Sequence, residues 1–453
     1  MHSTDAKPHR GWASRWTFIL AATGSAVGLG NIWKFPYITG EYGGGAFVLV
    51  YLGCILLVGV PVMMAEVLLG RRGRRNPISA MELLAQESGA PKAWSIIGWA
   101  GMLAGLMILS FYSVVAGWTL DYILRMANGS LQGATPDLVS STFAGLLGNP
   151  NELLGWHTAF ILMTVTIVAS GVSKGLGNAA KILMPLLFVL LLLLLGYSLA
   201  RGDFSRAFHF MFDFNVSKLT GEAILVALGH SFFTLSLGMG AMLTYGSYMP
   251  TKAAIGKTVI TIALLDTLVA LMAGMAIFPL VFAHNLEPAS GPGLMFMSLP
   301  SAFGHMPGGV LFGTFFFVLV SIAALTSAIS LIEPGVAWLN ETWHVKRLRA
   351  SILLGLIGWL GGVACIFSNN WLDLHPADGW YVFETLDFVA SNIMLPLGGL
   401  LIALFTGWIM RDEKRREELQ DLAPGLYTLW LWVVRVAAPI GVLIIFLNSL
   451  GAF

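Results

Sequence analysis

Eleven segments of this chain are long and apolar enough to cross a lipid bilayer, and this feature constrains the fold more than any other. They span roughly residues 14–38, 44–70, 93–126, 156–172, 178–200, 219–248, 254–283, 309–342, 348–368, 380–410 and 426–450. A transmembrane helix needs about 20 apolar residues. Only 11% of the 453 residues are charged, whereas a soluble domain carries about 25%. We therefore expect an all-α integral membrane protein with eleven transmembrane helices.

The loops between these segments differ in their content of Lys and Arg. Neither residue occurs in the loops 128–155, 284–308 and 369–379. The alternate loops carry several each, and only loop 201–218 breaks the pattern. Because basic loops remain in the cytoplasm, we expect residues 1–13 to form a cytoplasmic tail. Eleven crossings then place the C-terminus outside the cell.

The first segment contains an irregular stretch at residues 23–36, Thr-Gly-Ser-Ala-Val-Gly-Leu-Gly-Asn-Ile-Trp-Lys-Phe-Pro. Each glycine costs about 1 kcal/mol in a helix relative to alanine, and polar groups at this depth are expensive. The glycines are Gly24, Gly28 and Gly30, and the polar residues are Asn31 and Lys34. In lipid, irregular backbone persists only where it is buried in protein or lines a cavity. Half-helix ends there bind anions and cations, so this break is predicted to be a transporter's binding site.

A second irregular stretch lies at residues 229–246, where Gly238 and Gly240 bracket Met239 in the middle of the sixth segment. The two interrupted segments are five apart, so they cross the bilayer in opposite directions. Two inverted repeats of five helices would produce this arrangement, with the binding site at their interface. The repeats would span 14–200 and 219–410, and 426–450 would be one extra helix.

Polar side chains inside other segments suggest a cation. The eighth segment carries Thr326, Ser327 and Ser330. Such hydroxyls usually bond to their own helix's carbonyls, but beside a broken helix they also suit a small hard cation, which prefers several oxygen ligands. Asp266 lies within the seventh segment, where a buried carboxylate is costly and usually functional. Glu66 is expected to have a structural role.

Other chemistry is not indicated. The net charge of +1 gives no reason to expect binding to nucleic acid. The two cysteines, Cys54 and Cys365, lie in apolar surroundings and are expected to be buried small residues rather than a disulfide or metal site. No nucleophile–base pair is evident, so the chain is not expected to be an enzyme.

Four motifs, in this order along the chain, resemble those of the neurotransmitter:sodium symporter family. They are Gly-Ser-Ala-Val-Gly-Leu-Gly-Asn-Ile-Trp-Lys-Phe-Pro at 24–36, Glu-Tyr-Gly-Gly-Gly-Ala-Phe at 41–47, Phe-Phe-Thr-Leu-Ser-Leu-Gly at 232–238 and Ala-Ala-Leu-Thr-Ser at 323–327. The resemblance implies the leucine-transporter-like fold, with a 5+5 inverted repeat and helices 1 and 6 broken. It also implies sodium-coupled symport of an amino acid by alternating access, at a bacterial cell (inner) membrane.

The resemblance assigns roles to residues of this chain. The substrate amino acid would be bound by Ala26, Gly28, Leu29, Gly30, Ile108, Tyr112, Phe233, Thr234, Ser236, Met239, Ser327 and Leu331. One sodium ion would be held by Gly24, Val27, Ala323, Thr326 and Ser327, and a second by Ala26, Asn31, Thr234, Asp266 and the substrate carboxylate. The largely apolar lining favours hydrophobic L-amino acids.

The same resemblance implies two gates. The outer gate would pair Lys34 with Asp387 above Tyr112 and Phe233. The inner gate would join an N-terminal cation and Trp12 to Glu341 near Tyr248. The family's usual arginine position is held by His9, with Arg10 displaced by one residue, so either could supply that cation.

Chloride-dependent members have serine at the position of Ala270 and asparagine at that of Asp266. Asp266 would then supply the negative charge that chloride provides elsewhere, so no chloride requirement is expected. Two alternatives remain open at this point: a proton-coupled carrier that uses Asp266 or Glu333, and a sensor that binds an amino acid without transporting it. The sequence leaves the preferred amino acid, the sodium stoichiometry and the oligomeric state undetermined.

Overall fold

The computed structural model describes residues 11–286, 292–376 and 379–449. Within these ranges the chain is helical apart from its connections and one isolated bridge between Gly44 and Phe214. Nine helices of this described part are long and apolar enough to cross a membrane. The two remaining apolar segments, the first and the sixth, are the interrupted ones.

The helices follow the expected segments closely. The first six segments and their loops contain α1 (Arg15–Ala26), η1 (Gly30–Lys34), α2 (Phe35–Glu41), α3 (Gly45–Cys54), η2 (Ile55–Gly59), α4 (Val60–Gly73), α5 (Pro77–Glu87), η3 (Lys92–Ser95), α6 (Ile96–Ala127), α7 (Pro136–Leu147), α8 (Pro150–Ala169), η4 (Val172–Gly177), α9 (Asn178–Arg201), α10 (Phe204–Phe212), η5 (Val216–Lys218), α11 (Gly221–Thr234) and α12 (Ala241–Ser247). The remaining segments contain α13 (Ile255–Ala283), η6 (Leu294–Ser298), α14 (Leu299–His305), α15 (Gly309–Thr342), α16 (Arg347–Asn370), α17 (Val382–Asp387), η7 (Phe388–Met394), α18 (Leu395–Leu404), η8 (Phe405–Ile409), α19 (Asp412–Glu418), α20 (Pro424–Trp432), η9 (Val433–Ala437) and α21 (Ala438–Ser449).

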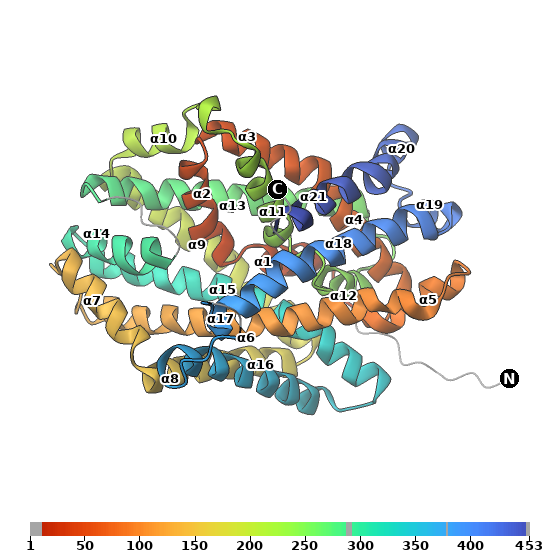
Figure 1. Ribbon diagram of the computed structural model, residues 1–453, viewed down its shortest axis with the longest axis horizontal. Coiled ribbons are helices and arrows are strands. Elements are labelled where there is room, and N and C mark those ends of the chain that lie inside the picture. The colour runs from red at the N-terminus through yellow and green to blue at the C-terminus, as the bar shows by residue number, and fades with distance from the viewer. Residues whose placement is uncertain (1–10, 287–291, 377–378, 450–453) are drawn as a thin grey trace.

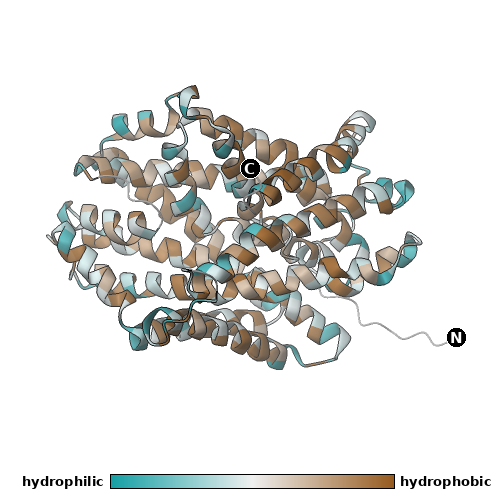
Figure 2. Cartoon of the chain, viewed as in Figure 1, coloured by the Kyte–Doolittle hydropathy of each residue, from teal (hydrophilic) through white to brown (hydrophobic). Residues whose placement is uncertain are grey.

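The long helices run roughly along the longest axis of the molecule (Figure 1). At the centre α15 packs along α6, and α1 packs against α9, α13 and α15. Figure 1 places α5 and α19 at one end of this axis and α7, α10 and α14 at the other. Apolar residues predominate along the helices and polar residues at these two ends (Figure 2). Following the predicted orientation, we call the end with α5 and α19 the inner face and the opposite end the outer face.

The fourth apolar segment differs from its expected bounds of 156–172. Its helix α8 begins earlier, at Pro150, because Pro fits the first helical position and the Asn149 side chain caps the helix. Asn149 Oδ1 accepts a hydrogen bond from Glu152 N at 3.3 Å. The helix ends at Ala169, before Gly171, whose φ of 98° is a conformation that glycine tolerates.

The first transmembrane segment is interrupted after Ala26. Val27 is extended, with φ −71° and ψ 107°, and helical backbone resumes near Leu29. Gly24, expected to help break the helix, instead lies inside α1, where a Cβ would meet Thr326 Cβ at 3.1 Å. That glycine therefore provides close helix packing, and the chain leaves the helix at Val27 and Gly28.

The sixth segment is interrupted between Thr234 and Ala241. Ser236, Gly238 and Gly240 all have positive φ, at 54°, 78° and 73°. At Gly238 a Cβ would lie 2.4 Å from Leu395 O, so only glycine fits there. The two glycines around Met239 therefore make the break that the sequence predicts.

Glu66 on α4 stabilises the broken sixth segment. Its carboxyl accepts hydrogen bonds from Gly238 N at 3.1 Å and from Leu243 N at 3.3 Å. These are backbone donors that a break in a helix leaves without an intrahelical partner. The structural role expected for Glu66 agrees with this geometry.

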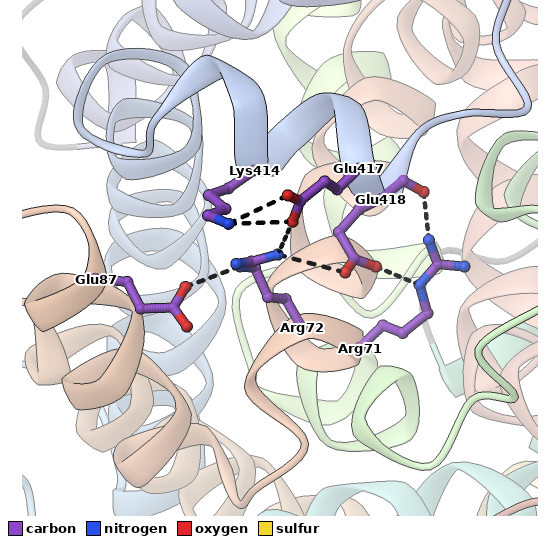
Figure 3. Close-up of polar contacts among 6 residues, drawn as sticks. All are labelled: Arg71, Arg72, Glu87, Lys414, Glu417 and Glu418. Carbon is purple, nitrogen blue, oxygen red and sulfur yellow. Dashed lines mark hydrogen bonds and ion pairs between the residues drawn. The ribbon is translucent and has the colours of Figure 1, made fainter.

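A network of ion pairs at the inner face joins the consecutive helices α4 and α5 to the distant helix α19 (Figure 3). At the end of α4, Arg71 Nε donates to Glu418 Oε2 at 2.6 Å. The neighbouring Arg72 donates from Nε to Glu87 Oε2 at 2.9 Å and from Nη1 to Glu417 Oε2 at 2.8 Å. Arg71 and Arg72 thereby tie α4 to α5 and to α19.

Candidate functional site

A cavity of about 30 Å³ lies where the two breaks face α6 and α15. Every residue expected to bind the substrate lines it: Ala26, Gly28, Leu29, Gly30, Ile108, Tyr112, Phe233, Thr234, Ser236, Met239, Ser327 and Leu331. Ser25, Asn31 and Ser330 complete the lining. A space of this size holds roughly one or two water molecules, so the lining must move to admit an amino acid side chain.

The backbone of the first break faces Tyr112 on α6. Leu29 N lies 3.5 Å from Tyr112 Oη, within hydrogen-bond distance. A Cβ on Gly28 would lie 2.8 Å from Ser327 Oγ and 3.1 Å from Tyr112 Oη. A side chain at position 28 would therefore displace the hydroxyl of Ser327 from the backbone. Amide N–H groups at a helix start bind anions such as carboxylates, so this corner can bind a substrate carboxylate.

The first expected sodium site contains oxygen atoms from α1 and α15. Ser327 Oγ lies 3.4 Å from Gly24 O and 3.3 Å from Val27 O. Thr326 Oγ1 donates to Ala323 O at 3.1 Å, which is the ordinary bonding of a threonine to its own helix. Carbonyl and hydroxyl oxygens from both helices thus lie close together, as a hard cation requires.

The second expected sodium site contains a hydrogen-bonded trio. Asn31 Nδ2 donates to Asp266 Oδ1 at 2.8 Å and to Thr234 Oγ1 at 3.1 Å. Thr234 Oγ1 lies 2.9 Å from Asp266 Oδ2. Asn31 Oδ1 accepts from Gly28 N at 3.0 Å, which holds the asparagine against the first break. Asn31 and Asp266 are completely buried, so the carboxylate of Asp266 lies within reach of both breaks.

The outer gate residues line one cavity but are not paired. Lys34, Asp387, Tyr112 and Phe233 all border a space of about 220 Å³ at the outer side of the site. In the described part of the chain no ion pair joins Lys34 to Asp387. Lys34 Nζ lies 5.6 Å from the centre of the Phe233 ring, and Asp387 accepts from Ser391 Oγ at 2.8 Å.

The inner side is closed by Trp12, which is 4% exposed. Its backbone N donates to Tyr248 O at 2.9 Å, and its indole Nε1 donates to Tyr245 O at 3.1 Å. Glu341 accepts from Asn76 N at 2.6 Å and from Asn76 Nδ2 at 2.9 Å. His9 and Arg10, the expected gating cations, lie outside the described residues.

Tyr248 bonds to a different carboxylate from the one expected near it. Its hydroxyl donates to Glu333 Oε1 at 2.8 Å. Arg347 Nη1 donates to the same oxygen at 3.0 Å, and Arg347 Nη2 pairs with Glu333 Oε2. Glu333 is therefore fully engaged in hydrogen bonds with an arginine and a tyrosine, as a structural role requires.

Sequence reasoning missed Ser25, which lines the cavity, and Arg347, which holds Glu333. Ser330, which the sequence groups with Thr326 and Ser327 as a candidate cation cluster, also lines the cavity. It follows Ser327 by three residues and so shares its helix face. Arg347 could not have been found, because an arginine in a basic loop is interpreted only as evidence for the orientation of the chain in the membrane. Nothing in the spacing of Ser25 distinguishes it from a residue packed against a neighbouring helix.

Two broken membrane helices around a buried cavity with clustered oxygen ligands define an ion-coupled membrane transporter. The profile of the Sodium:neurotransmitter symporter family matches residues 9–136 and 148–453. This chain belongs to that family.

Individual relatives agree with this assignment. The sodium-dependent transporter YhdH of Bacillus subtilis (strain 168) is 39% identical over 97% of this chain and 97% of its own length. The sodium- and chloride-dependent taurine transporter of Bos taurus is 24% identical over 93% of this chain and 75% of its own length. The crystal structure of MhsT in complex with L-phenylalanine aligns with a TM-score of 0.89 at 44% identity, covering 97% of this chain and 99% of that chain.

The family resemblance and the fold class expected from the sequence are thus confirmed. The chain has the helical, leucine-transporter-like fold of a multi-pass membrane transporter. The repeat boundaries and the individual site roles stay predictions.

Proposed function

We propose that this protein is a symporter that couples the entry of sodium to the uptake of hydrophobic L-amino acids. The observation that carries the proposal is the position of the buried cavity between the two breaks, with Asn31 and Thr234 on its border and Asp266 hydrogen-bonded to both. In this arrangement the substrate carboxylate and a sodium ion share one site, so each increases the affinity for the other.

The lining supports a hydrophobic substrate. The side chains of Ile108, Phe233, Met239 and Leu331 face the cavity, and its lining includes no ionised side chain that would pair with a charged substrate side chain. Met239 is flexible and lies between two glycines, so its side chain can move to make room for a bulky substrate. The relative MhsT has been crystallised with L-phenylalanine, which fits the same class.

The proposed cycle is alternating access across a bacterial inner membrane, with the N-terminus in the cytoplasm. Sodium and the amino acid enter from the outer face, the outer gate closes, and the inner gate around Trp12 then opens. Moving one charge through 100 mV yields about 2.3 kcal/mol. Two sodium ions that enter with a zwitterionic amino acid would give about 4.6 kcal/mol at 100 mV. This free energy corresponds to a roughly thousandfold accumulation of the amino acid.

Chloride is not required in this proposal. Asp266 is buried beside Asn31 and Thr234 and supplies a fixed negative charge there. Ala270 offers no hydroxyl to an anion. A fixed carboxylate next to the sodium site makes an accompanying mobile anion unnecessary.

Uptake by purified protein in proteoliposomes tests the proposal. Tritiated leucine, tryptophan and glycine are compared with and without an inward sodium gradient. We expect accumulation of leucine and tryptophan only with the gradient, and much weaker uptake of glycine. Uptake that persists without sodium and follows a pH gradient would overturn sodium coupling in favour of proton coupling. Binding without any flux would indicate a sensor.

A further inference from the structure

Three serine hydroxyls from three different helical segments meet at one end of the cavity. Ser25 comes from α1, Ser236 from the break in the sixth segment and Ser330 from α15. Ser25 Oγ lies 2.7 Å from Ser330 Oγ and 3.2 Å from Ser236 Oγ. All three border the cavity, and they are 3%, 4% and 1% exposed. We call these three residues the serine floor.

The protons of the serine floor are all committed to bonds within the protein. Ser236 Oγ donates to Ser25 O at 2.9 Å, and Ser330 Oγ donates to Ser327 O at 2.7 Å. Ser25 Oγ donates to Ser330 or Ser236. Each hydroxyl has one proton but two lone pairs. The serine floor therefore offers unused acceptors to the cavity and no unused donor.

Within the first segment, Ser25 of the serine floor lies on the inner side of the amides that suit a substrate carboxylate. Along the chain, Ser25 precedes the amides of Leu29 and Gly30, and Lys34 follows them towards the outer face. The apolar walls are Ile108, Met239 and Leu331, among others. A substrate whose carboxylate binds at the amides of Leu29 and Gly30 would direct its side chain past the apolar walls. The end of that side chain would then meet the hydroxyl oxygens of the serine floor.

We propose that the serine floor selects hydrophobic amino acids whose side chain ends in a neutral hydrogen-bond donor, such as the N–H of an indole. This inference rests on the proposed function and specifies its substrate class further. A donor that reaches the serine floor gains a hydrogen bond to an oxygen with a free lone pair. An apolar end of the same shape leaves that oxygen buried without the bond, which costs affinity.

The test compares L-tryptophan with 3-(3-benzothienyl)-L-alanine, in which sulfur replaces the N–H and the shape is retained. Dissociation constants are measured by calorimetry on purified protein in saturating sodium. Because one neutral hydrogen bond is at stake, we expect tryptophan to bind about five- to tenfold more tightly. Equal affinities would overturn the inference. This comparison needs no substitution, so it does not depend on the folding of a variant.

Substitutions then assign the effect to the serine floor. In Ser25→Ala and in Ser330→Ala the affinity ratio of the two ligands should fall to about threefold or less. Ser321→Ala is the matched control, because Ser321 lies buried on the same helix as Ser330 but bonds to Thr119 Oγ1 at 2.7 Å. Its ratio should equal that of the wild type. A ratio that stays high in both floor variants would overturn the assignment.

The outcomes separate this inference from the proposed function. Sodium-driven uptake of phenylalanine, measured in proteoliposomes, tests the symporter alone. If uptake occurs and the two ligands bind equally, the symporter stands and the serine floor has no role in selection. If neither ligand binds in sodium, the inference is overturned, and phenylalanine uptake then decides whether the proposed substrate class stands.

Discussion

Replacing Asn31 by alanine should strongly weaken the response to sodium at the second sodium site. The Asn31 amide bonds to Asp266 Oδ1 at 2.8 Å and to Thr234 Oγ1 at 3.1 Å, and its oxygen accepts from Gly28 N at 3.0 Å. Asn31→Ala removes one proposed sodium ligand and leaves the carboxylate of Asp266 with one partner fewer.

The expected magnitude follows from the loss of one oxygen ligand. A polar contact to a charged group contributes about 1.5–3 kcal/mol, and Asn31→Ala would remove the proposed contact between the amide oxygen and sodium. This corresponds to a rise of roughly 10- to 150-fold in the sodium concentration needed for half-maximal binding. The Gly28 N–H would also lose its buried partner, which costs about 1–3 kcal/mol of stability whether or not sodium is bound. We therefore expect at least about a tenfold rise.

The assay is binding of tritiated phenylalanine to purified protein over a series of sodium concentrations at constant ionic strength. The matched control is Asn340→Ala, because Asn340 is exposed at the inner end of α15 and its amide donates to Val345 O at 2.8 Å. The control should titrate like the wild type. An unchanged sodium midpoint in Asn31→Ala would refute the assignment of this residue as a sodium ligand.

Three further predictions concern the anion, the backbone and the inner face. Replacing chloride by gluconate should leave sodium-driven uptake unchanged, because Asp266 supplies the negative charge, and a loss of uptake would contradict that role. Gly238→Ala should lower thermal stability by several kcal/mol, since a positive φ and a carbonyl oxygen 2.4 Å from the new Cβ both oppose it. Gly196→Ala, whose Cβ would meet nothing within 4 Å, is its control and should be tolerated in the same melting assay. At the inner face, hydrogen bonds from Lys414 and a neighbouring arginine lower the pKa of Glu417. The ionised Glu417 therefore stabilises the folded protein at every pH above the ordinary glutamate pKa. This stabilisation is lost as the pH falls through the lowered pKa of Glu417. As the pH falls below about 4, the melting temperature of the wild type should therefore decrease, and that of Glu417→Gln should decrease less.

Much of the site could be predicted from the sequence, because each of the two breaks has a local signal in the chain. Gly28 marks the first break, and Gly238 and Gly240 mark the second. Backbone breaks of this kind have a strong sequence signal, since clustered glycines weaken a membrane helix and irregular backbone at that depth must line a cavity or be buried in protein. Once the motifs set the register, the residues expected to bind the substrate all lie around one cavity.

The remaining features depend on side chains that meet across helices, which spacing along one chain does not reveal. The bond between Ser25 and Ser330 joins positions far apart in sequence, as does that between Tyr248 and Glu333. The outer pair of Lys34 and Asp387 shows a different limit. Both residues reach the same cavity without pairing, since the motifs predict their neighbourhood but not the distance between their charged groups.

The central claim is that the two broken helices bind sodium and an amino acid in one shared site. The most direct test is the dissociation constant of phenylalanine for the purified wild-type protein, measured by calorimetry at a series of sodium concentrations with choline as the replacement cation. The account predicts that this constant falls steeply as sodium rises, with no measurable binding in choline alone. Equal affinity for phenylalanine in sodium and in choline would contradict it.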